Sequence, residues 1–287
     1  MDALATTIVS GIVLGSLYAL MASGLSIIWS TIGVFNFSHG ALMMVGAFVA
    51  WSVSEAAGLG LIPGLICGIT VAALLGVIIE YFLIRPFYGQ PNMLLITVMT
   101  TLAAMIVLEK GALLIWGPRL KQLPRLLDGD VSVLGTTISA HELLIICIAP
   151  VILLLLWFFT SRTATGRSLR AVGQNQDAAA LIGINVSTTF ALTFALGAAL
   201  AALSGILLGG IRFVTPNLGV EPLVKAMIVV IFGGLGSLGA TVGAAFVIGM
   251  AEALLVFTIG LYWTPFMLFA GLILVLVFRP NGLFGKV

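Results

Sequence analysis

The run AHELLIICIAPVILLLLWFFT, residues 140–160, decides how this chain folds. It contains one acidic residue near its start and no lysine or arginine. A helix rises about 1.5 Å per residue, so about 20 apolar residues are enough to cross the hydrocarbon core of a membrane. The run does not alternate apolar and polar residues, as a strand of a membrane barrel would. We therefore predict a transmembrane helix here.

The rest of the chain repeats this character. Of its 287 residues 61% are hydrophobic and 8% are charged, whereas an average soluble domain is roughly 45–50% apolar. Further apolar segments lie at 5–29, 40–54, 62–84, 93–116, 187–212, 223–235, 238–258 and 263–279. We predict an all-α polytopic membrane protein with about eight to nine transmembrane or partial spans, forming a single domain over residues 1–287. A net charge of +2 without an extended basic tract argues against a nucleic-acid partner.

Three residues bear on processing and cross-linking. Cys67 and Cys147 fall inside apolar runs, so we predict small buried hydrophobic residues rather than a disulfide or a metal pair. The first charged residue is Asp2, and the basic start of a cleavable signal peptide is missing. The first apolar run is therefore expected to stay as a membrane helix.

The sidedness of the chain follows from parity and charge together. Lysines and arginines occur in segments 85–92 and 161–186 and in the tail, namely Arg85, Arg162, Arg167, Arg170, Arg279 and Lys286. Loop 117–139 is also basic, so charge alone is a weak guide. An even number of crossings separates segment 85–92, segment 161–186 and the tail from one another, so all three lie on the same side. Their basic residues together place that side in the cytoplasm. Loop 117–139 and the N-terminus are then expected outside.

Two stretches interrupt the apolar pattern. STIGVFNFSHGALM (30–43) holds polar residues between apolar ones, and FGGLGSLGATVGAA (232–245) is rich in glycine. A backbone without hydrogen-bond partners costs several kcal/mol per group in lipid, so both stretches must pack in protein or line water. Broken helices at depth commonly mark where a transporter holds its solute. The candidate residues of a translocation path are Asn36, Ser38, His39, Thr97, Thr101, Gly233, Gly234, Gly236 and Ser237.

Two details of these candidates have alternative interpretations. His39 could be a proton relay or a metal ligand, but a single histidine favours a local hydrogen bond at a helix break, with Asn36 and Ser38 capping the following helix. Thr97 and Thr101 lie on one face of the fourth span, where small hydroxyls pack helices or line a pathway. The sequence does not separate the last two.

Acidic residues inside the apolar spans need partners. A charge at the centre of a membrane costs about 2.5–3.5 kcal/mol on the insertion scale. Glu80 lies about one turn from Arg85, Glu109 is next to Lys110, and Glu252 is within reach of Arg212 or Lys225 in the predicted bundle. We predict structural pairing rather than solute binding at all three.

The polar segment TGRSLRAVGQNQDAAALIGINV (165–186) differs from its apolar neighbours. Arg167 and Arg170 are three residues apart and share a helix face. Asp177 suits the cap or first turn of a short helix, and Gly183 suits a left-handed end to it. We predict a short, stiff, basic element outside the membrane. Its simplest alternative is a loop held by phospholipid headgroups.

This segment also resembles a known family. DAAALIG (177–183) resembles the EAA-x-x-x-G cytoplasmic loop of bacterial ABC importer permeases, with Asp in place of Glu and without the I-x-L-P that follows there. The longer string GRSLRAVGQNQDAAALIGINV resembles the permeases of branched-chain amino-acid importers and of their urea and amide relatives. Four further strings in the same order resemble that family: GIVLGSLYALMASGLSIIW (11–29), IGVFNFSHGALMMVGAF (32–48), VIFGGLGSLGATVGAAFVIGMAEA (230–253) and RPNGLFG (279–285).

The resemblance implies a permease subunit of the bacterial cytoplasmic (inner) membrane. Its expected partners are a homologous second permease, two cytoplasmic ABC ATPases, a periplasmic or extracellular solute-binding protein, and membrane lipid. Loop 161–186 would be a coupling helix docked in an ATPase cleft, with Gly166, Arg167, Arg170, Asp177, Ala178, Ala179 and Gly183 as the coupling residues. No G-x-x-x-x-G-K-[ST] phosphate loop occurs, so we expect no cofactor in this chain and ATP and Mg²⁺ on the partners.

The expected solutes are leucine, isoleucine and valine, ahead of urea, short amides and aromatic or dicarboxylic acids. An ion-coupled carrier is a second hypothesis, but it would need a cation-binding cluster where only His39 is present. An intramembrane hydrolase built on Ser237 is a third, and there Leu235 replaces the first glycine of G-x-S-x-G. The sequence therefore favours transport without catalysis.

Overall fold

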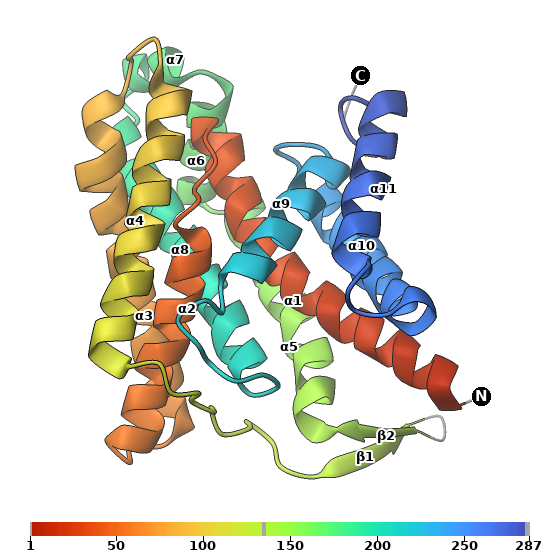
Figure 1. The fold of residues 1–287 in the computed structure, drawn as a ribbon. Coiled ribbons are helices and arrows are strands. Elements are labelled where there is room, and N and C mark those ends of the chain that lie inside the picture. Colours follow the sequence, from red (N-terminus) through yellow and green to blue (C-terminus); the bar gives the residue numbers. More distant parts are fainter. Residues whose placement is uncertain (1, 134–135, 285–287) are drawn as a thin grey trace.

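The computed structural model describes residues 2–133 and 136–284 (Figure 1), so Gly285 and Lys286 lie outside the described residues. The helices are α1 (Asp2–Ile32), α2 (His39–Trp51), α3 (Leu61–Ile79), α4 (Met93–Trp116), α5 (Ala140–Arg162), α6 (Ala164–Gln174), α7 (Gln176–Leu181), α8 (Val186–Gly209), α9 (Val220–Gly233), α10 (Leu238–Ile259) and α11 (Thr264–Phe278). Short π-helical turns, η1 (Ser52–Ala56) and η2 (Glu80–Ile84), continue α2 and α3, and a 3₁₀ turn, η3 (Arg85–Phe87), follows η2. The strands are β1 (Asp130–Val133) and β2 (Thr136–Ser139).

Within residues 2–133 and 136–284, six helices are long and apolar enough to cross a membrane. They are Ala3–Ile32, Leu61–Phe87, Met93–Trp116, Ala140–Arg162, Val186–Gly209 and Leu238–Ile259. Each matches one of the apolar segments of the sequence, which confirms a multi-pass helical membrane protein. The other three segments form the shorter helices α2, α9 and α11. The finer count of eight to nine spans therefore stays a prediction.

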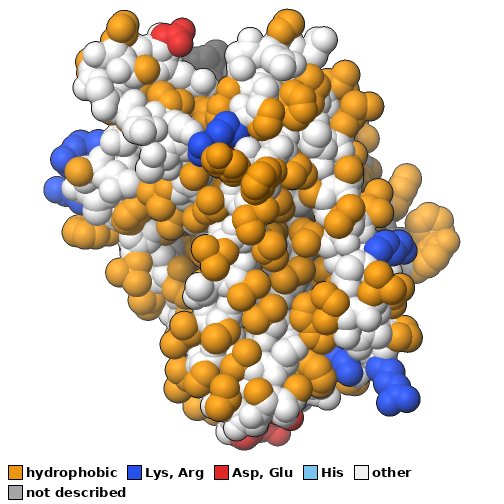
Figure 2. All heavy atoms as spheres, turned by 90° about the vertical axis from the view of Figure 1, so that its left-hand side faces the viewer, with side chains coloured by type: hydrophobic (Ala, Val, Ile, Leu, Met, Phe, Trp, Pro, Cys, Tyr) orange, Lys and Arg blue, Asp and Glu red, His pale blue; other side chains and the backbone are white. Residues whose placement is uncertain are grey.

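The outer helices present apolar side chains, as a lipid-facing surface requires. Figure 2 shows hydrophobic side chains over most of the face formed by α3 and α4. Cys67 and Cys147 are free, as predicted, but both are exposed. The prediction that they are buried was wrong because an apolar run has both a lipid-facing and a protein-facing side, and these residues lie on the former.

Helix α1 forms the centre of the bundle. It crosses the structure diagonally in Figure 1 and packs against α5, α8, α9 and α10. Glycines make the closest approach possible: a methyl group on Gly11 would meet the backbone of Met250, and one on Gly15 would meet that of Phe246. Small residues at such positions let membrane helices pack at short range.

The polar segments are sorted between the two ends of the bundle, as parity predicts. Figure 1 shows α6, α7, the turn between α3 and α4 and the C-terminal end of α11 at one end. The N-terminus and the β1–β2 hairpin lie at the opposite end. Which end faces the cytoplasm rests on the basic residues and stays a prediction. The end that carries α6 and α7 is called the inner end below.

Two breaks place helix starts inside the bundle. Residues 33–38 separate α1 from α2, which confirms the break predicted at 30–43. The second lies at 210–219 ahead of α9, a position that the sequence analysis missed. Helix α9 has 14 residues, about 21 Å of rise, whereas the hydrocarbon core is about 30 Å thick. The start of α9 therefore lies within the membrane.

The two helix starts touch each other. A methyl group on Gly40 would fall on the carbonyl oxygen of Gly219, and one on Gly219 would fall on the carbonyl of Gly40. Only residues without a side chain allow this backbone contact between α2 and α9. The glycine-rich stretch 232–245, by contrast, forms no break at depth. Its irregular part is the turn between α9 and α10 toward the inner end (Figure 1).

The outer loop 117–139 contains structure that the sequence analysis did not predict. Strands β1 and β2 pair antiparallel, with Val131 opposite Ile138. Farther back in the same loop, Lys121 pairs with Val214 in an isolated bridge. That bridge ties the loop to the segment between α8 and α9, so the outer loop supports the second helix break.

Candidate functional site

Helix α6 is held rigidly on the inner end of the bundle. Helix α5 ends at Arg162, and the Thr163 hydroxyl accepts a hydrogen bond from the Gly166 N–H at 3.0 Å, which caps α6. Gly166 is needed because a methyl group there would overlap the carbonyl oxygens of Phe159 and Thr160. The chain therefore turns from membrane helix to surface helix without a flexible linker.

The two arginines of α6 point back to the end of α5. Arg170 donates from Nη1 to the Thr160 carbonyl at 2.6 Å and from Nη2 to that of Ser161 at 3.4 Å. Arg167 donates to the Arg162 carbonyl at 3.2 Å. Positive groups at a helix C-terminus satisfy its free carbonyls and favour its dipole. Both arginines thus brace α6 against α5, a role that the sequence analysis did not predict.

Helix α7 follows after a single non-helical residue. Asn175 caps it by accepting from the Ala178 N–H at 2.9 Å, and Asp177 lies in its first turn. Gly183 ends it with φ of +87°, and Ala179 is buried beneath it. The predicted first-turn position of Asp177 and left-handed Gly183 are both confirmed. The cap itself comes from Asn175.

The tip of this element is apolar. Leu181 is 89% exposed and Ile182 is 76% exposed, at the inner end and beside the turn of Gly183. Aliphatic side chains outside the membrane gain stability only when something covers them. The sequence analysis passed over both residues, although they are the two large apolar residues that follow the alanines of DAAALIG.

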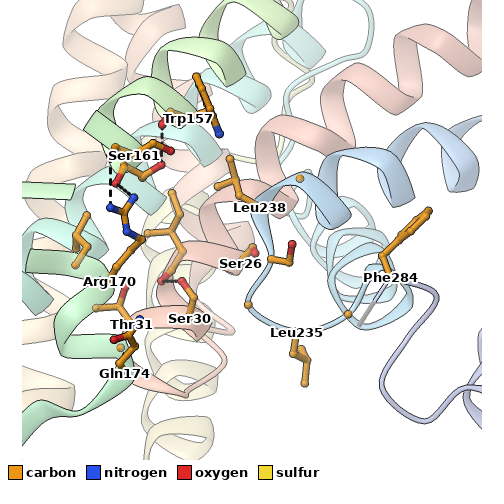
Figure 3. A pocket seen from close by; sticks show the side chains of 18 of the residues that line it. Ser26, Ser30, Thr31, Trp157, Ser161, Arg170, Gln174, Leu235, Leu238 and Phe284 are labelled. Carbon is orange, nitrogen blue, oxygen red and sulfur yellow. Dashed lines mark hydrogen bonds between the residues drawn. The ribbon is translucent and has the colours of Figure 1, made fainter. Parts of the chain in front are cut away.

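A cavity of about 820 Å³ opens between α6 and the turn that joins α9 to α10, residues 234–237. Its wall combines residues from the two predicted sites. Arg170 comes from the predicted coupling element, residues 161–186, and Gly234, Gly236 and Ser237 come from the candidate translocation path. Figure 3 shows Arg170 and Ser161 on one side and Leu235 and Phe284 on the other, with Ser26 and Ser30 of α1 nearby. Movement of α6 would therefore change the shape of a polar space at the inner end of the bundle.

The other path candidates come together away from this cavity. Asn36, Ser38, His39, Thr97 and Thr101 are at most 1% exposed and line none of the described cavities. Thr101 Oγ1 accepts from the backbone N–H of residue 37, while Thr97 Oγ1 has no hydrogen-bond partner among the described residues. The hydrogen bonds of Asn36, Ser38, His39 and Thr101 fix the break before α2, and the place of these residues and of Thr97 on a path stays a prediction. Gly233 is also buried, against Ala240.

The hydrogen bonds at this break refine one prediction. His39 is fully buried and its Nε2–H donates to the Met21 carbonyl at 3.1 Å, which confirms a local hydrogen-bonding role. The predicted side-chain caps of α2 were wrong. Ser38 donates its hydroxyl and its N–H to Asn36 Oδ1, at 2.5 and 3.1 Å. Asn36 therefore folds the chain tightly before the helix rather than capping it.

Two of the three predicted ion pairs are present among the described residues, whereas Glu109 forms none with Lys110 there. At the inner end Arg85 meets Glu80 at 3.1 Å, and Tyr88 donates to the same carboxylate at 2.6 Å. Burial and this hydrogen bond raise the pKa of Tyr88 well above its ordinary value. Glu252 pairs with Lys225 at 2.5 Å rather than with Arg212.

Lys225 belongs to a larger network. Its ammonium also contacts Glu221 at 2.5 Å, and Glu221 in turn meets Arg212 at 3.4 Å. Tyr18 of α1 donates to Glu252 at 2.8 Å. The network, defined here as Tyr18, Arg212, Glu221, Lys225 and Glu252, joins α1, α9 and α10 beside the second helix break. Sequence analysis found one pair of this chain of contacts and missed the rest.

The chain is similar to known permease proteins. Residues 7–278 match the family described as "Branched-chain amino acid transport system / permease component". The high-affinity branched-chain amino acid transport system permease protein BraD of Pseudomonas aeruginosa is 33% identical, over 97% of this chain and 95% of the relative. LivH of Escherichia coli, a permease protein with the same description, is 31% identical over 96% of this chain and 94% of its own. The structure of PsaBC from Streptococcus pneumoniae aligns with a TM-score of 0.42 and 19% identity, over 96% of this chain and 89% of the other.

Proposed function

The chain belongs to the branched-chain amino acid transport permease family, and from this premise we propose that it is the membrane-spanning subunit of an ATP-binding-cassette importer. The solutes that it moves inward are leucine, isoleucine and valine. Urea, short amides and aromatic or dicarboxylic acids are the alternatives within the same kind of permease. Its location is the bacterial cytoplasmic membrane, with the end that carries α6 and α7 in the cytoplasm.

The importer needs four kinds of component besides lipid. This subunit pairs with a homologous second permease, and two cytoplasmic ATPases bind ATP and Mg²⁺ and supply the energy. A solute-binding protein delivers the solute from outside. The permease alternates between outward-open and inward-open forms as the ATPases close and reopen.

The observation that carries this proposal is the apolar tip of the coupling element. Leu181 and Ile182 are almost fully exposed on an element that Thr163, Asn175 and the α6 arginines hold in a fixed orientation. Complete burial of one such side chain contributes about 1.5–3 kcal/mol. Two apolar residues on a rigid support suit insertion into a cleft of a partner, and a membrane surface would instead favour a longer apolar face.

The same element connects docking to the inner cavity. A methyl group on Gly173 of α6 would overlap the Ser30 carbonyl at the end of α1, so α6 packs directly on the central helix. A push on α7 passes through α6 to α1 and to the cavity wall that includes Ser237. This contiguity supports coupling between ATPase movement and access to the inner end.

The experiment compares two matched substitutions in the complete importer. Leu181→Asp alters the apolar tip, and Leu120→Asp places the same charge on another exposed leucine, in the loop 117–139. We expect Leu181→Asp to reduce the ATPases that co-purify with the permease at least tenfold, and Leu120→Asp to leave them unchanged. Equal co-purification for both variants would refute docking at this tip.

Uptake tests the function itself. Vesicles that carry the complete importer, with a leucine-loaded binding protein outside them, should accumulate leucine only when ATP is inside, and vanadate should stop this uptake. Uptake that an ion gradient drives without ATP would favour the ion-coupled carrier instead.

A further inference from the structure

The ionic network lies inside the thickness of the membrane. Tyr18 lies 14 residues before the end of α1 at Ile32, and Glu252 lies 14 residues after the start of α10 at Leu238. At about 1.5 Å per residue, both are about 21 Å from the inner ends of their helices. Glu221 stands in the first turn of α9, at a similar depth. A core about 30 Å thick therefore surrounds all three positions.

The network has a buried part and an exposed part. The side chains of Lys225 and Glu252 are 7% and 3% exposed, whereas those of Arg212 and Glu221 are 45% and 53% exposed. Half-exposed charges at this depth are not compatible with a lipid contact, which costs about 2.5–3.5 kcal/mol per charge. The face that carries Arg212 and Glu221 must meet water or protein.

The exposed pair has unused binding capacity. Arg212 makes one hydrogen bond among the described residues, at 3.4 Å, which leaves most of its guanidinium N–H groups free. A guanidinium binds a carboxylate through two parallel hydrogen bonds. Glu221 is held at its other oxygen by Lys225, so the oxygen that faces Arg212 is available to an ammonium group.

Apolar residues lie next to the pair. The space beside Arg212 and Glu221 holds only about 10 Å³, room for about one water molecule, and its mainly apolar wall consists of Leu14, Leu17, Tyr18, Met43, Ser204, Leu208 and Pro222. Arg212, Lys225, Glu221 and Glu252 sum to zero formal charge, and an amino-acid zwitterion adds none. The bound network would therefore carry no net charge into the membrane, which avoids the cost of burying an unpaired ion.

We propose that Arg212 and Glu221 form the binding subsite for the α-carboxylate and the α-ammonium of the solute within the thickness of the membrane. This inference rests on the proposed function. The zwitterion inserts into the loose ion pair, its carboxylate on Arg212 and its ammonium on Glu221, and its branched side chain lies on the exposed side of the pair. Lys225 and Glu252 are positioning residues that hold Glu221 from the buried side. The second permease supplies the facing wall of the site.

The test uses the complete importer in vesicles with saturating, leucine-loaded binding protein. Arg212→Gln and Glu221→Gln each remove one charge, and Arg125→Gln is the matched control on the outer loop, where it is exposed. We expect maximal uptake to fall at least tenfold in the two test variants. The control should transport normally, and the second permease should co-purify with all three.

A charge-swapped variant separates solute binding from a structural bridge. Arg212→Glu together with Glu221→Arg restores an ion pair but reverses its direction beside Lys225 and Glu252, so uptake should stay at least tenfold below that of the unmodified importer. Recovery of uptake in the swapped variant, normal uptake in the single variants, or loss of the second permease from them would each overturn the subsite. Absence of ATP-driven leucine uptake in the unmodified importer would refute the proposed function instead.

Discussion

Lys225 joins two carboxylates inside the bundle, and its replacement by methionine should destabilise the subunit strongly. The change removes the ammonium from Glu252, whose side chain is 3% exposed and would keep only the hydroxyl of Tyr18 as a partner. Removing one member of a buried pair costs about 3–5 kcal/mol, because the remaining charge is uncompensated. The contact with Glu221 adds about 0–1 kcal/mol, since that carboxylate is half-exposed. We therefore expect a loss of about 3–5 kcal/mol.

The free energy of unfolding in mixed micelles measures this loss. The double variant Lys225→Met with Glu252→Gln removes both charges, and it should recover at least about 2 kcal/mol because a neutral amide can still accept from Tyr18. Lys110→Met on α4 is the matched control: Lys110 is exposed, and its replacement should change stability by about 0.5 kcal/mol or less. A loss below about 1 kcal/mol for Lys225→Met, or no recovery in the double variant, would show that the buried pair does not hold α9 to α10.

Three further predictions concern the helix contacts, the coupling element and the sidedness. Gly219→Ala should reduce the yield of folded protein at least fivefold in fluorescence-detected size exclusion, because its methyl group falls on the backbone of α2, whereas Gly239→Ala enters open space and should leave the yield unchanged. Gly183→Ala strains a φ of +87° by about 1–2 kcal/mol and should lower ATPase co-purification with normal membrane insertion; unchanged co-purification would count against the role of this turn. In a chain without native cysteines, Gln176→Cys should react with an impermeant thiol reagent only from the cytoplasm and Asp128→Cys only from outside. The opposite labelling would reverse the assigned topology.

The sequence was sufficient to predict a structural feature wherever that feature depends on residues of one continuous segment. Each of the six long spans was predicted from its own apolar run, because a membrane helix satisfies its backbone hydrogen bonds within itself. The turn at Gly183 and the first-turn position of Asp177 were predicted for the same reason: both depend on residues a few positions away. The pair of Glu80 and Arg85 also lies within one helical turn or so.

Features that join distant segments were missed or only partly predicted. The contact between Gly40 and Gly219 joins two breaks that are 179 positions apart, and neither glycine stands out in a chain with 34 of them. The exposure of Cys67 depends on which side of a uniformly apolar helix its neighbours cover. The arginines of α6 were expected to contact a partner, and their hydrogen bonds to the carbonyls at the end of α5 were not predicted.

The amino-acid sequence by itself determined that this protein is a helical bundle in a membrane, which polar segments share a side, and to which family it belongs. Only the tertiary structure decided that α9 starts at depth, that Arg212 and Glu221 stand half-exposed beside a buried pair, and that Leu181 and Ile182 project from a braced element. The physical reason is the separation along the chain of the residues that interact. Hydropathy and backbone hydrogen bonding act along neighbouring residues, whereas exposure and charge pairing are set by whichever distant helices pack nearby.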